Sequence, residues 1–398
     1  MSFDPAEKIQ ALKAFGEFGG VNPSITDSST YTFLTPNKML ELFESEIEGC
    51  FLYSRHFNPI NKYLCDALAS MENMESAQVT SSGMGAITST ILQLCSAGDE
   101  LIAGWTIYGG TYAFLANVLP RFGIKVKFVD ITDLEKVTDA ITENTKLIYC
   151  ETISNPLMEV ADIKALSMIT KKNNIKLVVD NTFSPMVLTP GLYGADIVVH
   201  SLTKFINGTS DCVAGVICST KEFIAQVTDI NTGTCMLLGP VLDSMRAGSI
   251  LKNLHSLHLR MKKHSENASY LAKQISNYGV KVYYPGLESH PQHKLISEMI
   301  NRDYGYSGMM VVDAGDSEKA NKLMEKMQNT GVGYLAVSLG YFKTLFSSPA
   351  SSTSSEIPEE RRNEMGLSDG MIRLSVGLDS DIENTYKKIE ECLKALKL

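Results

Sequence analysis

Residues 196–211 read DIVVHSLTKFINGTSD, and in this stretch a short apolar run gives way to a single lysine, Lys204. An isolated ammonium group where a buried strand ends is costly to remove from water. Two interpretations are open. The side chain can reach solvent and serve solubility, or its pKa can be lowered so that the amine forms a Schiff base.

Short apolar runs and helical patterns alternate around this stretch. Strands that are apolar throughout and separated by helices predict an α/β fold, with a mostly parallel sheet covered by helices on both faces. In such sheets, ligands bind at the carboxyl ends of the strands. The apolar runs are residues 77–82, 100–104, 125–130, 146–151, 176–183, 196–201 and 213–219.

The 398 residues exceed what one hydrophobic core comfortably holds, so several parts are expected. Residues 1–58 alternate turn residues with short polar pieces and are predicted to form an extended arm. Residues 59–255 contain the α/β pattern, and residues 256–398 are expected to form a smaller C-terminal α+β domain. Its strand candidates are 281–286, 308–315 and 371–378, and the Ser- and Pro-rich segment 347–362 is typical of a flexible loop.

Composition excludes several classes of protein. A net charge of −9 argues against a nucleic-acid partner. The chain contains no apolar run of about eighteen residues and no leader-like N-terminus, so we expect no membrane span and a cytoplasmic location. Its eight scattered cysteines suggest free thiols. No metal site is expected: His255, His258 and His264 are interpreted as a solvated helix face.

Three features fall at the carboxyl ends of predicted strands. The small-residue turn SSGMGA (81–86) leads into a helical run, where backbone N–H groups favour a phosphate. The alternative is a tight turn without a ligand. Asp180 ends an apolar strand and needs a positive partner, such as a protonated ring nitrogen, unless it only caps the following turn. The hydroxyls of Ser201 and Thr203, beside Lys204, can bind a phosphate.

Together these features match one cofactor. A phosphate cradle, an acid for a pyridinium nitrogen and a Schiff-base lysine are what pyridoxal 5'-phosphate (PLP) requires. The chain supplies them in that order on successive predicted strands. We therefore interpret Lys204 as the cofactor's anchor.

The sequence also resembles a known family, the Cys/Met-metabolism PLP enzymes of fold type I. The resemblance covers nearly the whole chain and implies the PLP-dependent transferase-like fold. Segments 285–295, 301–308 and 336–345 resemble the plant-like branch of the methionine γ-lyases. The implied activity is the PLP-dependent α,γ-elimination of L-methionine to 2-oxobutanoate, ammonia and methanethiol. The motifs that carry the resemblance are YSRHFNP (53–59), IYGGTYAF (107–114), ETISNP (151–156), HSLTKFINGTSD (200–211) and RLSVGL (373–378).

The resemblance implies a role for each matching residue. Lys204 and Tyr108 would be catalytic, and Tyr108 would also stack on the cofactor. Arg373, with Ser338 near it, would bind the α-carboxylate of the amino-acid substrate. The other cofactor-binding residues would be Gly83 and Met84 through their backbone, Ser201 and Thr203 at the phosphate, Asp180 at the ring nitrogen and Asn155 at the phenolic oxygen.

The resemblance also implies an assembly. Tyr53 and Arg55 would reach the phosphate bound by the neighbouring subunit, which explains the arm. The protein would then be at least a homodimer, and the family usually forms homotetramers.

Two positions depart from the family's pattern. Gly110 stands where well-studied microbial methionine γ-lyases have cysteine, and Thr209 stands where relatives often have histidine. Within the family, a cystathionine γ-lyase or γ-synthase, or an O-acetylhomoserine sulfhydrylase, remains an alternative. Outside it, the chain could be a nucleotide-binding α/β protein with a structural lysine, although it has no G-x-G-x-x-G turn. A relative that binds PLP without catalysis is the third alternative.

Overall fold

A seven-stranded sheet forms the centre of the computed structural model, which describes residues 3–13, 16–44, 49–350, 352 and 357–398. The strand order is β1-β7-β6-β5-β4-β2-β3. β7 runs antiparallel to both neighbours, and the other adjacent pairs are parallel. The mostly parallel sheet is therefore confirmed, and each predicted apolar run is one of its strands. These strands are β1 (Ser76–Thr80), β2 (Glu100–Gly104), β3 (Lys125–Val129), β4 (Thr145–Glu151), β5 (Lys176–Asp180), β6 (Ile197–Ser201) and β7 (Gly215–Ser219).

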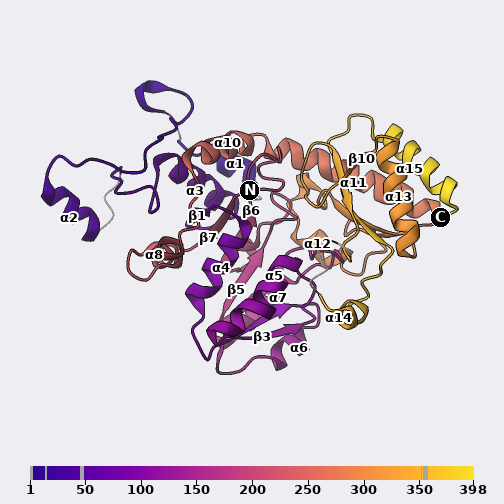
Figure 1. Ribbon diagram of the computed structural model, residues 1–398, viewed down its shortest axis with the longest axis horizontal. Coiled ribbons are helices and arrows are strands. Elements are labelled where there is room, and N and C mark those ends of the chain that lie inside the picture. The colour runs from indigo at the N-terminus through magenta and orange to yellow at the C-terminus, as the bar shows by residue number, and fades with distance from the viewer. Residues whose placement is uncertain (1–2, 14–15, 45–48, 351, 353–356) are drawn as a thin grey trace.

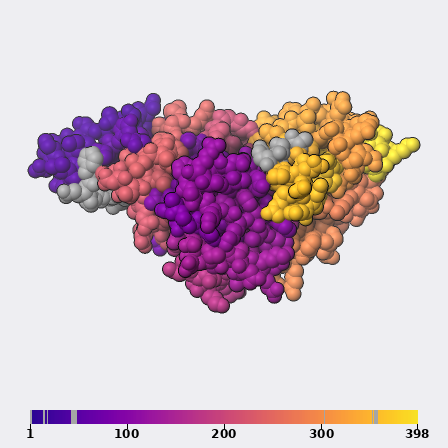
Figure 2. Space-filling model, turned by 60° about the horizontal axis from the view of Figure 1, so that its bottom comes forward, coloured from indigo at the N-terminus to yellow at the C-terminus, as the bar shows by residue number. Residues whose placement is uncertain are grey.

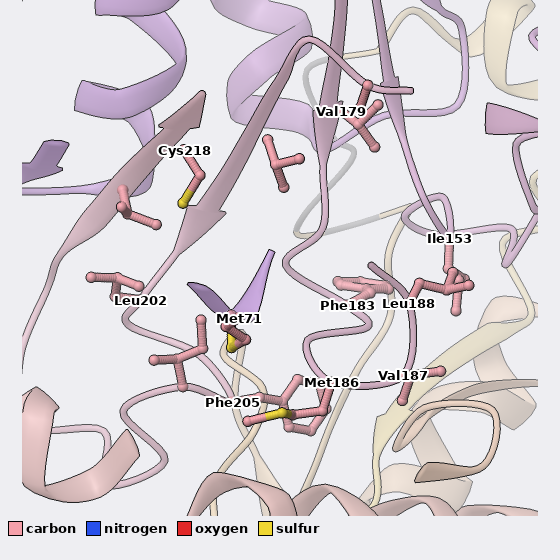
Figure 3. Packing of buried hydrophobic residues seen from close by; sticks show 14 of the residues in the cluster. Met71, Ile153, Val179, Phe183, Met186, Val187, Leu188, Leu202, Phe205 and Cys218 are labelled. Atoms are coloured by element: carbon pink, nitrogen blue, oxygen red, sulfur yellow. The ribbon is translucent and has the colours of Figure 1, made fainter. Parts of the chain in front are cut away.

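Helices cover both faces of this sheet because alternate strand residues point to opposite sides. Val179 and Val198 belong to one buried cluster, part of which Figure 3 shows, and Val178 and Val199 belong to the other. The first cluster includes residues of α3 (Pro59–Met71), α6 (Leu134–Asp139), α7 (Ile163–Asn173) and α10 (Ser244–Leu254). The second includes residues of α4 (Gly83–Leu94), α8 (Lys221–Thr228) and α9 (Thr234–Leu238), and α5 (Gly109–Ala113) begins the short helical segment beside it.

A second sheet lies toward the C-terminus, in the order β10-β11-β12-β9-β8. The three strands expected there are present. β10 and β11 were not predicted, because three or four residues are too few to establish a period. The strands are β8 (Lys281–Tyr283), β9 (Met309–Asp313), β10 (Gly333–Leu335), β11 (Thr344–Ser347) and β12 (Met371–Ser375), and helices α12 (His293–Met299), α13 (Ser317–Asn329), α14 (Glu359–Glu364) and α15 (Ile382–Leu396) accompany them. Residues 351 and 353–356 of the expected loop 347–362 lie outside the described residues.

The long helix α11 (Leu257–Tyr278) links the two sheets, as Figure 1 shows. Met261 packs into the core of the first sheet, whereas Leu271 packs into the core of the second. The expectation of a solvated histidine face is wrong for His264. This residue is fully buried, and its Nδ1 lies 2.7 Å from the carbonyl oxygen of Val376.

The N-terminal segment divides into two kinds of structure. α1 (Pro5–Gln10) packs on α3, and the Tyr304 hydroxyl donates to Asp4 at 2.7 Å. Farther along, α2 (Pro36–Glu44) projects from one end of the body (Figures 1 and 2). Val21 and Leu34, at 95% and 100% exposure, leave apolar surface uncovered there. The division into three parts at 58 and 255 remains a prediction.

The described part of the chain contains no helix that could span a membrane. None of its helices combines the length and the apolar composition needed to cross a bilayer.

Candidate active site

A cavity of about 450 Å³ opens where β4, β5 and β6 end and α4 and α5 begin. This is the edge at which ligands bind in α/β sheets. Segment 337–339 and β12 of the second sheet close its other side. Nine of the twelve site residues proposed from the sequence line it: Gly83, Met84, Tyr108, Asn155, Asp180, Ser201, Thr203, Lys204 and Arg373.

Lys204 faces this cavity from the turn after β6. Its Nζ donates to the Ser338 hydroxyl at 3.1 Å. Burial, followed by the charge of Arg373, lowers the pKa of Lys204 to about 8. The amine can therefore take up and return a proton near neutral pH.

The turn that carries Lys204 is held from two sides. On one side, the guanidinium of Arg260 on α11 donates to the carbonyl oxygens of Phe205 and Ile206. On the other side, Gly340 has a φ of +80°, and a Cβ there would lie 2.4 Å from the backbone nitrogen of Phe205. A glycine is required at this position, because any side chain would displace the turn.

Two buried carboxylates, Asp180 and Glu151, form the floor of the cavity. They end the adjacent strands β5 and β4 and stand opposite each other in register. Asp180 accepts from the backbone N–H of Thr182 at 2.9 Å and from the Tyr149 hydroxyl at 3.2 Å. Burial is the main factor that raises the pKa of Asp180. Asp180 does cap the following turn, but both of these donors are neutral, so its charge is left for another partner.

Glu151 was missed in the sequence analysis. Burial, followed by the charge of Asp180, raises its pKa to about 8. Its two oxygens accept from the backbone N–H groups of Tyr108 at 2.7 Å and of Asn155 at 2.8 Å. The signal was available, because Glu151 ends its apolar run just as Asp180 ends the next one. Glu151 thus fixes the backbone of two residues that line the cavity.

The start of α4 lies at one corner of the cavity. Ser82 caps this helix through its side chain, which accepts from the N–H of Gly85 at 2.9 Å. A Cβ at Gly83 would lie 2.7 Å from the Cβ of Ser201, so the helix can approach the end of β6 this closely only with glycine. Free N–H groups at a helix N-terminus favour a phosphate. The Thr203 hydroxyl oxygen lies beside them and accepts from the N–H of Ala214 at 3.0 Å.

Arg373 reaches the opposite side of the cavity from β12. Its guanidinium donates to Asn155 Oδ1 at 3.0 Å and to the Val337 carbonyl at 3.1 Å. A guanidinium carries five N–H donors, so donors remain for a ligand. Burial lowers the pKa of Arg373 to about 10, which still leaves it cationic at neutral pH. The contact with Arg373 leaves the Asn155 amide nitrogen as its donor toward the cavity.

The Tyr108 ring lies over Gly110, at the entrance. A Cβ at position 110 would lie 2.6 Å from Tyr108 Cε1. The ring can take this position because residue 110 is glycine, so the departure noted in the sequence has a structural consequence. Thr209 does not line the cavity; its hydroxyl donates to Asp211 at 2.7 Å on the surface.

Tyr53 and Arg55 are not brought into the cavity of their own chain. Arg55 donates to the carbonyl oxygen of Met236 on α9 at 2.9 Å and lies against the Tyr53 ring. Both side chains are exposed.

Comparison with known proteins identifies the family. The family described as "Cys/Met metabolism PLP-dependent enzyme" matches residues 7–394. The chain belongs to this family. It is 45% identical to the methionine gamma-lyase of Arabidopsis thaliana over 98% of this chain and 90% of that one. It is 37% identical to the L-methionine gamma-lyase of Fusobacterium nucleatum subsp. polymorphum, over 95% of each chain.

A solved structure from Campylobacter jejuni, described as an O-acetylhomoserine (thiol)-lyase, superimposes with a TM-score of 0.90. It covers 98% of this chain and 100% of its own, at 28% identity, and it carries a pyridoxyl-lysine phosphate residue. The fold type I architecture and the PLP cofactor predicted from the sequence are confirmed.

The residues that line the cavity are chemically suited to PLP. Two buried carboxylates without a cationic hydrogen-bond partner suit a protonated ring nitrogen. The glycine-lined helix start suits the phosphate, and a lysine of lowered pKa suits the aldehyde. We infer that the side chains and backbone groups identified from the sequence take these roles.

We predict that Glu151→Gln weakens PLP binding. A glutamine offers one acceptor oxygen where two backbone N–H groups now need one each. A buried hydrogen bond left unmade costs about 1–3 kcal/mol, so the Kd for PLP should rise about tenfold or more. The Kd is measured by titrating apoenzyme with PLP.

Glu159→Gln is the matched control, because Glu159 lies outside the cavity. Its carboxylate accepts from the Thr106 hydroxyl, whereas the N–H groups of Tyr108 and Asn155 donate to Glu151. Its Kd should stay within about twofold of the parent protein, well below the effect of a lost buried hydrogen bond. Equal effects of the two substitutions would contradict the role given to Glu151.

Proposed function

We propose that this protein catalyses the α,γ-elimination of L-methionine to 2-oxobutanoate, ammonia and methanethiol. The observation that carries the proposal is the cavity itself. It places one available guanidinium beside a lysine of lowered pKa, and its mouth is apolar. Two relatives that share more than a third of its residues over nearly their whole length are named methionine gamma-lyases.

Arg373 binds the α-carboxylate of the substrate. Its remaining N–H donors can pair with both carboxylate oxygens, and such bidentate pairing fixes direction as well as position. Asn155 and the Val337 carbonyl hold the guanidinium in place. The carbon that bears the amino group is then held on the side of the cavity where Lys204 lies.

Lys204 moves the protons. PLP, when bound, supplies an electron sink that stabilises negative charge on the carbon next to the amino group. With a pKa near 8, the Lys204 amine can remove the proton from that carbon and, once it has released this proton, a second proton from the adjacent β-carbon. The electron pair left at the β-carbon expels the thiolate from the γ-carbon. Ser338 orients the amine through its hydroxyl.

Tyr108 serves the leaving group. It lies at the entrance of the cavity, and the hydrogen bond from its backbone N–H to Glu151 fixes the position of its backbone. Its phenol can donate a proton to the departing thiolate. The free space above Gly110 lets the ring adopt this position.

The lining favours a thioether with an uncharged end. Val213 and Val337 line the mouth with more than half of each side chain exposed. Among the described lining residues, the cations are Lys204 and Arg373, and both are committed once an amino acid binds. Within the lining that one chain supplies, the distal amino-acid end of cystathionine would find no cation for its carboxylate. Apolar contacts discriminate weakly, by about 1–3 kcal/mol per methylene, so related thioethers should also react.

The activity test compares substrates directly. Holoenzyme incubated with methionine, cystathionine or O-acetylhomoserine plus sulfide is assayed for 2-oxobutanoate and for methanethiol. We expect kcat/KM to be highest with methionine. A higher kcat/KM with either of the other substrates would assign the protein to that activity instead.

Arg373→Lys provides the matched variant for this assay. It keeps the charge and removes the bidentate geometry. The kcat/KM for methionine should fall about 100-fold, since truncating one partner of a buried charged pair costs about 2–5 kcal/mol. An unchanged kcat/KM would remove Arg373 from the substrate site.

We also propose that the active site is completed by a second copy of the chain, with Tyr53 and Arg55 at the partner's phosphate corner. The support is their exposure, their absence from their own cavity and the projecting segment before them (Figure 2). The protein would be at least a homodimer, with a homotetramer as the expected form. The eight unpaired cysteines suit a reducing compartment, so we propose a cytoplasmic location.

Subunit complementation tests this arrangement. Lys204→Ala and Arg55→Ala homo-oligomers should each be nearly inactive. After the two are unfolded and refolded together, half of the dimers are mixed, and one of the two sites in each mixed dimer is intact. About one quarter of the parent activity should return. If the mixture shows only the sum of the separate activities, each site is built from a single chain.

A further inference from the structure

A buried pair of ionisable residues lies directly behind the cofactor cavity. His200 Nε2 is 2.7 Å from Glu72 Oε1, and both side chains are fully buried. Strand alternation puts His200 on the face of the sheet opposite Asp180: His200 shares its side with Val198, whereas Asp180 shares its side with Val178. The sequence analysis gave neither residue a role.

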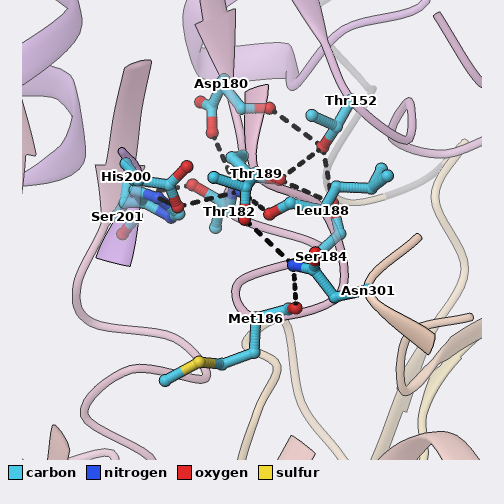
Figure 4. A network of polar contacts seen from close by, with 12 residues as sticks. Thr152, Asp180, Thr182, Ser184, Met186, Leu188, Thr189, His200, Ser201 and Asn301 are labelled. Atoms are coloured by element: carbon cyan, nitrogen blue, oxygen red, sulfur yellow. Dashed lines mark hydrogen bonds and ion pairs between the residues drawn. The ribbon is translucent and has the colours of Figure 1, made fainter. Parts of the chain in front are cut away.

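The pair joins the two strand ends that carry the cofactor residues. His200 directly precedes Ser201. Glu72 Oε1 also accepts from the side-chain amide of Asn181 at 3.0 Å, and Asn181 directly follows Asp180. Asn181 is fixed in turn by the hydroxyls of Thr152 and Ser184, at 3.0 and 2.7 Å, in the network of Figure 4. One carboxylate oxygen thus ties the end of β5 to the end of β6.

Stability alone does not account for this pair. Buried ion pairs are often no more stabilising than apolar residues of the same volume. Here, His200 Nδ1 and Glu72 Oε2 have no hydrogen-bond partner among the described residues, which adds to the cost. A carboxylate with only neutral donors in this interior would be an uncompensated charge, and a proton on His200 removes that penalty.

The residues around the pair show which groups a positive charge on His200 would affect. Cys218, on β7, is a buried thiol whose pKa is raised by burial and then by Glu72. Asp180 lies on the other face of the sheet. Burial has the largest effect on its pKa and raises it, whereas the hydrogen bonds with Thr182 and then a positive charge on His200 lower it. Asp180 is therefore the group through which a charge on His200 can act on the cavity.

We propose that Glu72 and His200 are positioning residues of the PLP site: Glu72 holds a cationic His200 behind Asp180, and this charge keeps Asp180 ionised toward the cofactor's ring nitrogen. The inference rests on the proposed role of Asp180. With Asp180 ionised, the proton that it shares with the ring nitrogen stays on the ring. Without the charge behind it, that proton moves toward the carboxylate.

The test measures the ring nitrogen itself. Apoenzyme is reconstituted with PLP labelled with ¹⁵N in the ring, and the ¹⁵N chemical shift is recorded at one pH. His200→Gln keeps a donor for Glu72 and removes the charge; Glu72→Gln keeps an acceptor for Asn181 and removes the partner. Both should move the signal toward that of an unprotonated pyridine. The Kd for PLP should rise about tenfold, because a hydrogen bond to a carboxyl group is weaker when that group carries no charge.

Ser184→Ala is the structural control. It removes a hydroxyl that holds Asn181 and leaves every charge in place. Its ¹⁵N shift should match the parent protein even if its stability falls. The double variant E72M/H200L is a second way to remove the charge in a folded protein, because an apolar replacement of a buried ion pair is often tolerated. It should show the same shift as His200→Gln.

An unchanged ¹⁵N shift in folded His200→Gln or E72M/H200L would overturn the inference, and so would an equal shift in Ser184→Ala. Asp180→Asn distinguishes the role of Asp180 from the role of the buried pair. If Asp180→Asn moves the signal and His200→Gln does not, only the role of the buried pair fails. If Asp180→Asn leaves it unmoved, the proposed role of Asp180 fails as well.

Discussion

The burial of opposite charges at one edge of an apolar sheet is the constraint on which this structure depends. Glu151 and Asp180 end neighbouring strands, and Lys204 and Arg373 face them across the cavity. Burial raises the pKa of each carboxyl group and lowers the pKa of each basic group. The charges are costly there unless something compensates them. PLP does so, because it brings a protonatable ring to the acids, a phosphate to a helix N-terminus and an aldehyde to the amine.

The backbone around the cavity is built to hold these groups still. Glycine at 83 lets α4 meet the end of β6, and glycine at 340 lets the connection between β10 and β11 meet the Lys204 turn. Arg260 binds that turn through its carbonyl oxygens. These contacts join segments from both sheets around one site. A catalytic lysine held from two sides loses little freedom when it reacts, and such preorganisation is a large part of what a catalytic site provides.

The sequence predicted the parts whose signal is local. Fully buried parallel strands read as apolar runs, so all seven strands of the first sheet could be located, along with the polar residues at the ends of β5 and β6. β10 and β11 could not be located, because they are too short to show a period. Glu151 stands at the end of an apolar run, but no motif gave it a role, so it was not predicted as a site residue. Glu72 and His200 are 128 positions apart, and Arg260 is 55 positions from Phe205, so only the folded chain shows that they meet.

The central claim is that Lys204 is the residue that holds PLP. Reduction of the holoenzyme with borohydride fixes the cofactor covalently to the lysine that binds it, and peptide mapping by mass spectrometry then locates the pyridoxyl group. The account predicts the label on the peptide that contains Lys204. A label on another lysine, or a holoenzyme in which no lysine is labelled, would contradict it.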